Sequence, residues 1–280
     1  MTYLINFLKR VVDVVLTRKK LRIASVITII LLASPMFSMV TNSSNFVGAA
    51  CGFSDDVDDV WFNAVKTFVE IIDAYQDWSA VFVKDYPDVG PYLMTEEVYG
   101  GHDDLYADLV ELFLLLAHGT ILCYANDGCV TIVYFNESWV APEQVKLGYK
   151  SPDGFGYNIW AFILSCGLLR DDSDDVVGVS AWSNTLAGTH MILGFANSAG
   201  IVNVDLPELA YRLTGTGGYP KQRVQDAFFS TFVKYDEIHK DNIARIIAED
   251  SYVADNDLID DFNRYVEVDN VKYIITCQIP

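Results

Sequence analysis

The sequence predicts an α/β fold in which a mostly parallel central sheet is covered by helices on both faces. Three buried strands are indicated by short apolar runs without a Lys, Arg, Asp or Glu, at residues 112–119, 160–167 and 191–196. Strand and helix patterns also alternate along the chain, as they do in such folds. The predicted domain covers residues 55–280, which is enough for one substantial α/β core.

Four segments are predicted to be helical. In Asp55–Tyr75, apolar residues recur at three- and four-residue spacing from Val57 to Ile72, and Ser54 is the expected cap. The other predicted helices are Ala181–Ala187, Arg223–Tyr235 and Asn242–Glu249.

Strands outside the three apolar runs are predicted from alternation and from turn signals. Ser79–Val83 alternates weakly and predicts a strand. Residues 120–135 form two β-rich arms around Asn126-Asp127-Gly128, which is a strong hairpin signal. A closing hairpin is predicted at Phe262–Ile279.

The net charge of −19 is distributed unevenly along the chain. Residues 1–50 contain six Lys or Arg and a single acid, whereas the remainder carries 13 Lys or Arg against 37 Asp or Glu, a balance of −24. A surface of this sign repels nucleic acid phosphates, so a nucleic acid partner is not expected. It suits cationic partners or divalent ions, and the alternative is that it serves solubility alone.

The amino-terminal segment is predicted to be a membrane anchor or a signal helix. Residues 1–22 are basic and precede an uncharged apolar stretch at residues 23–40, which is at the short end of a membrane span. Because clustered bases stay in the cytoplasm, we expect a single-pass protein of the cell membrane with its carboxyl-terminal domain outside. Secretion after signal cleavage is the alternative. Residues 41–54, which are small and polar, are predicted to be a linker.

Two of the predicted buried strands end on a chemically capable residue followed by glycine, as His118-Gly119 and Cys166-Gly167. Open α/β sheets carry functional groups at the carboxyl ends of such strands, so the imidazole and the thiol are expected in one crevice. A nearby imidazole can activate a thiol as a nucleophile. The N–H groups of Gly119 and Cys166 are the expected oxyanion hole, each typically worth about 3 kcal/mol. The alternative is a small buried cysteine and a histidine with a purely structural role.

The order buried strand, His-Gly, hairpin, buried strand, Cys-Gly resembles the caspase, gingipain and legumain group of cysteine peptidases. A closer similarity is to a bacterial and archaeal domain of unknown function, number 6345, and it covers about residues 55–240. The matching pieces are Tyr99-Gly100-Gly101, Ala117-His118-Gly119, Leu164-Ser165-Cys166 and residues 182–195. The resemblance implies a caspase/gingipain-like three-layer sandwich with Cys166 as nucleophile and His118 as acid/base. The sequence around Cys166 does not reproduce the caspase motif.

An acidic loop follows Cys166 closely and is expected to overlook the same crevice. It could select an Arg or Lys side chain of a substrate or bind calcium, and a solvated loop is the alternative. Its carboxylates are Asp171, Asp172, Asp174 and Asp175. No other metal or cofactor is expected.

Cys123 and Cys129 flank the predicted hairpin turn and are candidates for a disulfide, in keeping with an oxidising exterior. Two independent strand cysteines are the alternative.

The sequence therefore predicts a membrane-tethered, outward-facing cysteine peptidase that acts on a peptide or protein substrate through Cys166 and His118. The alternative from another class is a catalytically inactive domain of the same fold that binds cationic partners. A third hypothesis is hydrolysis of a small amide or ester by the same two residues.

Overall fold

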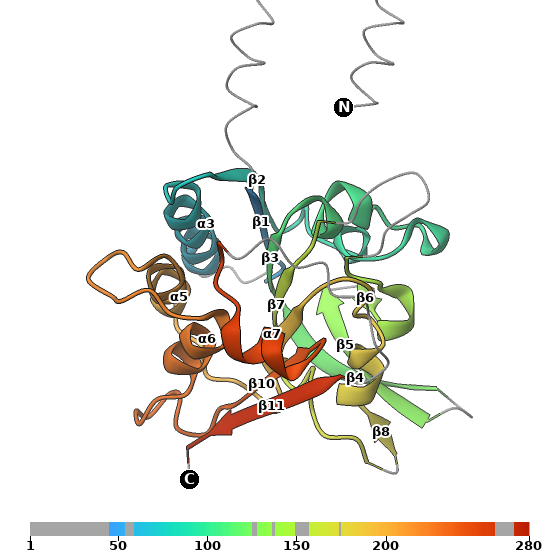
Figure 1. Ribbon diagram of the computed structural model, residues 1–280. Coiled ribbons are helices and arrows are strands. Elements are labelled where there is room, and N and C mark those ends of the chain that lie inside the picture. The colour runs from blue at the N-terminus through green and yellow to red at the C-terminus, as the bar shows by residue number, and fades with distance from the viewer. Residues whose placement is uncertain are drawn as a thin grey trace, which may run out of the picture. The chain divides into compact units, whose positions relative to one another are not determined.

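A seven-stranded sheet organises the part of the chain that the structure describes (Figure 1). The structure is a computed structural model, and it describes residues 45–53, 59–124, 128–135, 138–148, 157–173, 175–260 and 272–279. The predicted membrane segment at 23–40, the Ser54 cap, Asp174 and most of the hairpin turn lie outside these residues. No helix within them is long and apolar enough to cross a membrane.

The strands of the central sheet follow the order β11-β10-β9-β7-β3-β1-β2. Five of them, from β2 to β9, run parallel to their neighbours, and β10 is antiparallel to both β9 and β11. A mostly parallel sheet is therefore confirmed. The strands are β1 Asn45–Cys51, β2 Trp78–Asp85, β3 Leu112–Leu116, β7 Trp160–Leu164, β9 Met191–Phe195, β10 Ile243–Ala248 and β11 Tyr273–Gln278.

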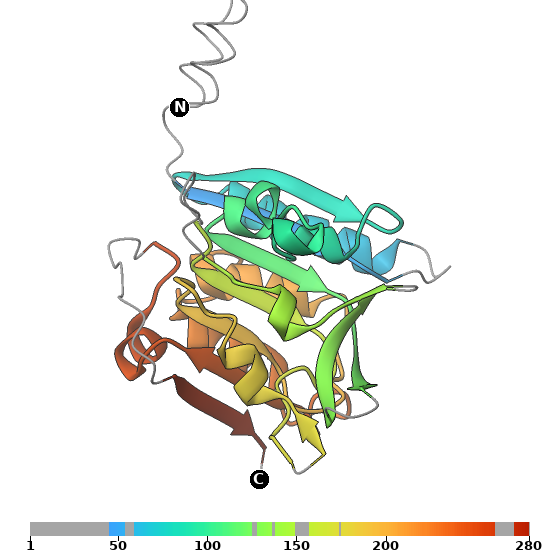
Figure 2. The same ribbon diagram turned by 90° about the vertical axis from the view of Figure 1, so that its right-hand side faces the viewer.

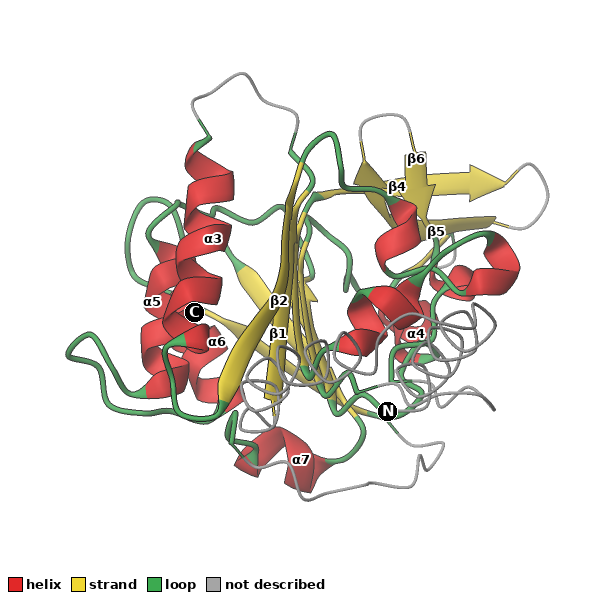
Figure 3. Ribbon diagram, turned by 90° about the horizontal axis from the view of Figure 1, so that it is seen from above, coloured by secondary structure: helices red, strands yellow, loops and turns green. Residues whose placement is uncertain are grey.

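The two faces of the sheet are covered differently (Figure 3). Helices α3 Val60–Asp73, α5 Asp205–Thr214 and α6 Val224–Phe232 cover one face. The other face carries helix α4 Val179–Ser183, short 3₁₀ helices and a second, four-stranded sheet. That small sheet consists of β4 His118–Tyr124, β5 Gly128–Phe135, β6 Ser138–Val140 and β8 Val176–Val177. Helix α7, Ser251–Asn256, follows β10, as Figure 2 shows by colour along the chain.

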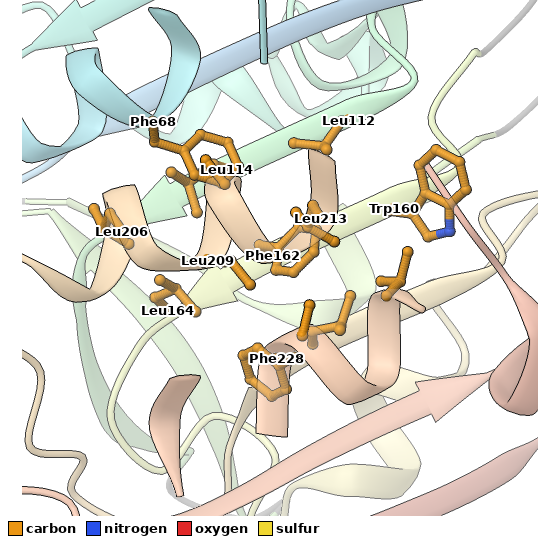
Figure 4. Packing of buried hydrophobic residues seen from close by; sticks show 14 of the residues in the cluster. Phe68, Leu112, Leu114, Trp160, Phe162, Leu164, Leu206, Leu209, Leu213 and Phe228 are labelled. Carbon is orange, nitrogen blue, oxygen red and sulfur yellow. The ribbon is translucent and has the colours of Figure 1, made fainter. Parts of the chain in front are cut away.

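Alternate side chains of the strands bury against the helices of the first face (Figure 4). Phe68 of α3, Leu209 of α5 and Phe228 of α6 meet Leu114 and Phe162 of the central strands, and all five are fully buried. Each such side chain typically stabilises the fold by about 1.5–3 kcal/mol. The side chains that point to the other face of these strands form a second hydrophobic core, which lies under the small sheet. The prediction that these apolar runs are strands buried on both faces is therefore confirmed.

Strand β1 corrects the prediction of a linker at residues 41–54. Residues 45–51 pair in parallel with β2, and residues 47–51 also pair in parallel with β3, so β1 lies between two strands of the sheet. The glycine at position 48 is required by packing, because a Cβ on Gly48 would lie 2.3 Å from the ring of Phe82. Ala49 and Ala50 are fully buried. Here a run of small residues belongs to a tightly packed strand. The same composition is also typical of linkers.

Strand β10 corrects the prediction of a helix at Asn242–Glu249. Ile243, Ile246 and Ile247 have the spacing of a helical face, but a strand buried on both sides produces the same apolar run. Arg245, which suggests a polar helix face, is in fact 5% exposed. Its guanidinium donates to the carbonyl oxygen of Leu169 at 2.7 Å, so the charge is satisfied inside the fold.

Most of the other predicted elements agree with the structure within a few residues. The predicted helices at 55–75, 181–187 and 223–235 correspond to α3, α4 and α6, and the hairpin corresponds to β4 and β5. Helix α5 is absent from the sequence-based prediction. The second arm of the predicted closing hairpin is β11, which pairs with β10, whereas residues 261–271 lie outside the described residues.

Candidate functional site at the carboxyl ends of β3 and β7

The fold brings the two predicted strand ends side by side. Strands β3 and β7 are parallel neighbours, and their last registered pair is Leu116 with Leu164. The Ala117 N–H continues the ladder by donating to the carbonyl oxygen of Leu164 at 3.3 Å. His118 and Cys166 each follow their strand by two residues, so both lie at this carboxyl edge of the sheet.

The two strand ends approach to backbone contact. A Cβ on Gly119 would lie 2.0 Å from the carbonyl oxygen of Cys166 and 2.6 Å from Oγ of Ser165. Ser165 itself is 1% exposed, and its Oγ has no hydrogen-bond partner among the described residues. Only glycine allows β4 to cross the Cys166 turn this closely. The close approach of two backbones is thus the physical reason for glycine in His118-Gly119.

Cys166 carries an exposed, free thiol on a tight turn. Gly167 has a φ of +63°, in the left-handed region that favours glycine, and its N–H donates to the carbonyl oxygen of Asn197 at 2.8 Å. Asn197 follows β9, and its side-chain oxygen accepts the N–H of Ile243 at 2.9 Å. The turn that presents the thiol is therefore anchored to the ends of β9 and β10. Sequence reasoning missed Asn197, although its place directly after a buried strand was a usable signal.

The imidazole of His118 is exposed and rests against an aromatic ring. The centroid of its ring lies 4.6 Å from that of Phe53, which follows β1 and contacts Trp61 at 5.9 Å in turn. His118 is paired with Tyr134, and Gly119 with Val133, so their side-chain positions face opposite sides of β4. The imidazole and the Cys166 turn therefore lie on opposite faces of β4, next to the first two residues of the strand. A group bound by both would lie across the free edge of this strand.

The N–H of Gly119 points away from β5. The Cys129 N–H donates to the carbonyl oxygen of Asp175 at 3.0 Å, outside the β4–β5 ladder, so Cys129 and Cys123 form a non-hydrogen-bonded pair. Pairs of this kind alternate along the ladder, and Gly119 with Val133 is another of them. The Cys166 N–H has no acceptor among the described residues. Both predicted oxyanion-hole donors are consequently available at this edge.

The acidic loop after Cys166 is partly neutralised by the chain itself. Asp171 pairs with Arg245 at 2.9 Å. Asp172 accepts the backbone N–H groups of Gly178 at 2.8 Å and Ser180 at 3.3 Å. Burial raises the pKa of Asp172, but the hydrogen bonds from Ser180 and Gly178 together outweigh it and hold the pKa below its usual value. Asp172 therefore shapes the loop, whereas Asp171 is paired with Arg245 but keeps a side chain that is 83% exposed.

Asp175 is exposed, and no cation pairs with its carboxylate among the described residues. Within those residues no group of three or more His, Cys, Asp or Glu side chains is placed to hold a metal ion. Cys123 and Cys129 are joined by a disulfide between directly opposite positions of β4 and β5.

Arg245 is a further residue that sequence reasoning missed. Besides its bonds to Leu169 and Asp171, its Nε donates to Oγ1 of Thr276 at 2.9 Å. It therefore ties the segment after Cys166 to β10 and β11. Its pattern in the sequence is that of a solvated helix face, so no sequence signal identified this role.

Comparisons with known proteins place the chain in a family. The family model described as "Domain of unknown function (DUF6345)" matches residues 92–264, which include both strand ends of the candidate site. A protein of Archaeoglobus fulgidus, described as "Uncharacterized protein", is 52% identical over 231 residues, or 82% of this chain and 85% of that protein. No solved structure matches the chain. The chain therefore belongs to the DUF6345 family.

Proposed function

We propose that this domain is a cysteine-dependent hydrolase of peptide bonds, related in mechanism to the caspase, gingipain and legumain group, with Cys166 as nucleophile and His118 as acid/base. One observation carries the proposal: Gly119 and Cys166 are in backbone contact at the carboxyl ends of two adjacent parallel strands. That contact gathers an exposed thiol, an exposed imidazole and two available N–H donors at one edge of the fold.

The proposed reaction follows from these four groups. The Cys166 thiolate attacks the substrate carbonyl carbon, and the resulting oxyanion accepts hydrogen bonds from the N–H groups of Gly119 and Cys166. The C–N bond then breaks as His118 donates to the leaving amine the proton that it took from the Cys166 thiol. Water, deprotonated by His118, hydrolyses the thioester and releases the acid. Each of the two donors is expected to stabilise the transition state by about 3 kcal/mol.

The charge of the domain supports a cationic substrate. Beyond residue 50 the chain has a balance of −24, and Asp175 lies on the exposed loop that follows Cys166. Since Asp171 and Asp172 are engaged within the chain, Asp174 and Asp175 are the proposed selectors of an Arg or Lys side chain. Neutralising this second pair should then remove any preference for basic residues.

The proposed location is the outer face of the cell membrane, with the domain tethered through residues 23–40. The disulfide between Cys123 and Cys129 supports an oxidising compartment. The basic segment before residue 23 supports the orientation.

Labelling with thiol-directed acyloxymethyl ketones tests the catalytic proposal on the full chain. Probes with Arg, Lys, Leu, Asn or Asp next to the reactive group would be compared by mass spectrometry. At least one basic probe is expected to label Cys166 about 100-fold faster than the half-buried Cys277, and Cys166→Ala should abolish the label. Cys277→Ser is the matched control and should label as the unmodified chain does. Failure of every probe to modify Cys166 would reject the proposed hydrolase. It would favour a catalytically inactive domain that only binds its partners.

A further inference from the structure

We infer that the free edge of β4 binds the substrate as an added antiparallel strand, so that the substrate is an extended peptide recognised through its backbone. This inference rests on the proposed function and extends it to substrate recognition. The residue whose carbonyl is attacked lies opposite Gly119, and the residue two positions before it lies opposite Ile121.

The free edge of β4 is open to pairing with another strand. In the small sheet β4 is the terminal strand, next to β5 alone among the described residues. The same alternation that turns the Gly119 N–H outward also turns out the backbone N–H and C=O groups of Ile121 and Cys123. Ile121 is 39% exposed, and β4 contains no Pro, Lys or other charge of the kind that blocks pairing at an edge. The edge is therefore a regular template for another strand.

The free edge of β4 lies next to the Cys166 turn. Strand β1 flanks β3 on one side and β7 flanks it on the other. Phe135 of β5 packs over Gly52, directly after β1, where an added Cβ would meet its ring at 3.0 Å. The Cys166 turn meets β4 at Gly119, because the carbonyl oxygen of Cys166 lies 2.0 Å from the Cβ position of this glycine, whose N–H points to the free edge. A peptide added to this edge therefore passes the thiol.

Pairing with β4 fixes which peptide residue lies opposite each residue of the strand. In an antiparallel pair, residues opposite each other exchange both backbone hydrogen bonds at every second position. The oxyanion donor Gly119 then also accepts the N–H of the residue under attack. Ile121 exchanges two hydrogen bonds with the residue two positions earlier, whose side chain lies beside Ile121 on the same face. Main-chain pairing of this kind gives affinity, while side chains at alternate positions give selectivity. An apolar or β-branched residue is thus preferred beside Ile121.

The test compares the rates at which acyloxymethyl ketone peptides of one and of three residues label Cys166. The residue next to the reactive group is the same in both. The three-residue probe is expected to label about tenfold faster, as two added backbone hydrogen bonds would supply. N-methylation of its first residue should remove that advantage, whereas N-methylation of its middle residue, whose N–H points away from β4, should preserve it.

A matched pair of variants tests the same contact from the protein side. Ile121→Pro removes one outward N–H from an edge strand, a position that tolerates proline, and should abolish the advantage of length. Ile121→Val keeps the N–H and should behave as the unmodified chain. If Ile121→Pro fails to fold, the N-methylated probes decide alone.

The outcomes separate the two proposals. A one-residue probe that labels Cys166, together with no gain from length or equal rates for the two N-methylated probes, would overturn pairing on β4 and leave the hydrolase standing. Absence of labelling by all of the probes would reject both.

Discussion

Replacement of Gly119 by alanine is expected to destabilise the domain by about 3 kcal/mol and to slow the labelling of Cys166 by a factor of about 100. The added methyl group would lie 2.0 Å from the carbonyl oxygen of Cys166 and 2.6 Å from Oγ of Ser165. Neither neighbour is the far end of a flexible side chain, so β4 and the Cys166 turn must separate. A displacement of about 1 Å at a reacting centre typically costs two orders of magnitude in rate.

Gly100→Ala provides the matched control for this variant. Gly100 has a φ of +85°, and a Cβ at this position would meet no atom within 4 Å. Its replacement is expected to cost about 1–2 kcal/mol through the backbone alone and to leave the labelling rate unchanged. Chemical denaturation and the labelling rate would be measured for both. A Gly119→Ala protein as stable and as reactive as the parent would mean that the two strand ends are not held in contact.

The second large effect is a gain in stability as the solution is acidified from pH 8 to pH 5. Burial raises the pKa of Asp103, Glu111 and Glu249 to about 7 in each case, and for Asp103 the charge of Glu96 adds to the effect. In the unfolded chain these groups ionise near their ordinary values of 3.8 and 4.5. Between these values and pH 7 the unfolded chain therefore releases protons that the folded chain keeps.

The stabilising contribution of a raised carboxyl is complete below its unfolded pKa and is lost as the pH rises through the folded pKa of about 7. Carboxyls with lowered pKa, such as Asp172 and Glu208, lose their contribution only as the pH falls below about 5, outside this window. The melting temperature is expected to be about 5–10 °C higher at pH 5 than at pH 8.

Glu249 allows this pH dependence to be assigned to one residue. Its side chain is 3% exposed, and neither carboxylate oxygen has a hydrogen-bond partner among the described residues. Burial outweighs the attraction of His190 and Lys272 in setting its pKa. Glu249→Gln is expected to raise the melting temperature at pH 8 by about 3 °C and to leave it nearly unchanged at pH 5.

The exposed Glu237 is the control, because its side chain is 91% accessible and it pairs with Lys240 only at the surface. Glu237→Gln should change neither melting temperature. A parent protein that melts at a lower temperature at pH 5 than at pH 8 would contradict the assignment of these three carboxyls. A Glu249→Gln variant whose melting temperature changes with pH as much as that of the parent would also contradict this assignment.

The parts of the fold that the sequence predicts are those in which one physical signal dominates. Strands β3, β7 and β9 are unbroken apolar runs, and the hairpin of β4 and β5 has a specific turn sequence. Their order was sufficient to place His118 and Cys166 at neighbouring strand ends, as the structure has them. Strand β10 has a pattern that helix and buried strand share, and β1 has small residues that its packing against Phe82 requires. In both strands the structure depends on contacts with segments that are distant in the sequence, so the local pattern does not reveal it.

The contacts around the site could not be predicted for a similar reason. Phe53 against His118, Asn197 beneath Gly167 and Arg245 on Leu169 each join segments that are far apart in the chain. The acidic loop shows that amino-acid composition does not reveal which charges are paired within the chain. A cluster of aspartates predicts a ligand-binding surface, but Asp171 and Asp172 are used within the chain, which only the tertiary structure reveals.

The most direct test of the shared site is the rate at which iodoacetamide alkylates Cys166 with and without the His118 imidazole. His118→Ala is expected to slow alkylation about tenfold at pH 6.5 and to leave it unchanged at pH 10.5, where thiols ionise without assistance. His102→Ala, which removes another exposed imidazole, should have no effect at either pH. Equal rates for the parent and His118→Ala at pH 6.5 would contradict the proposal that these two residues act together.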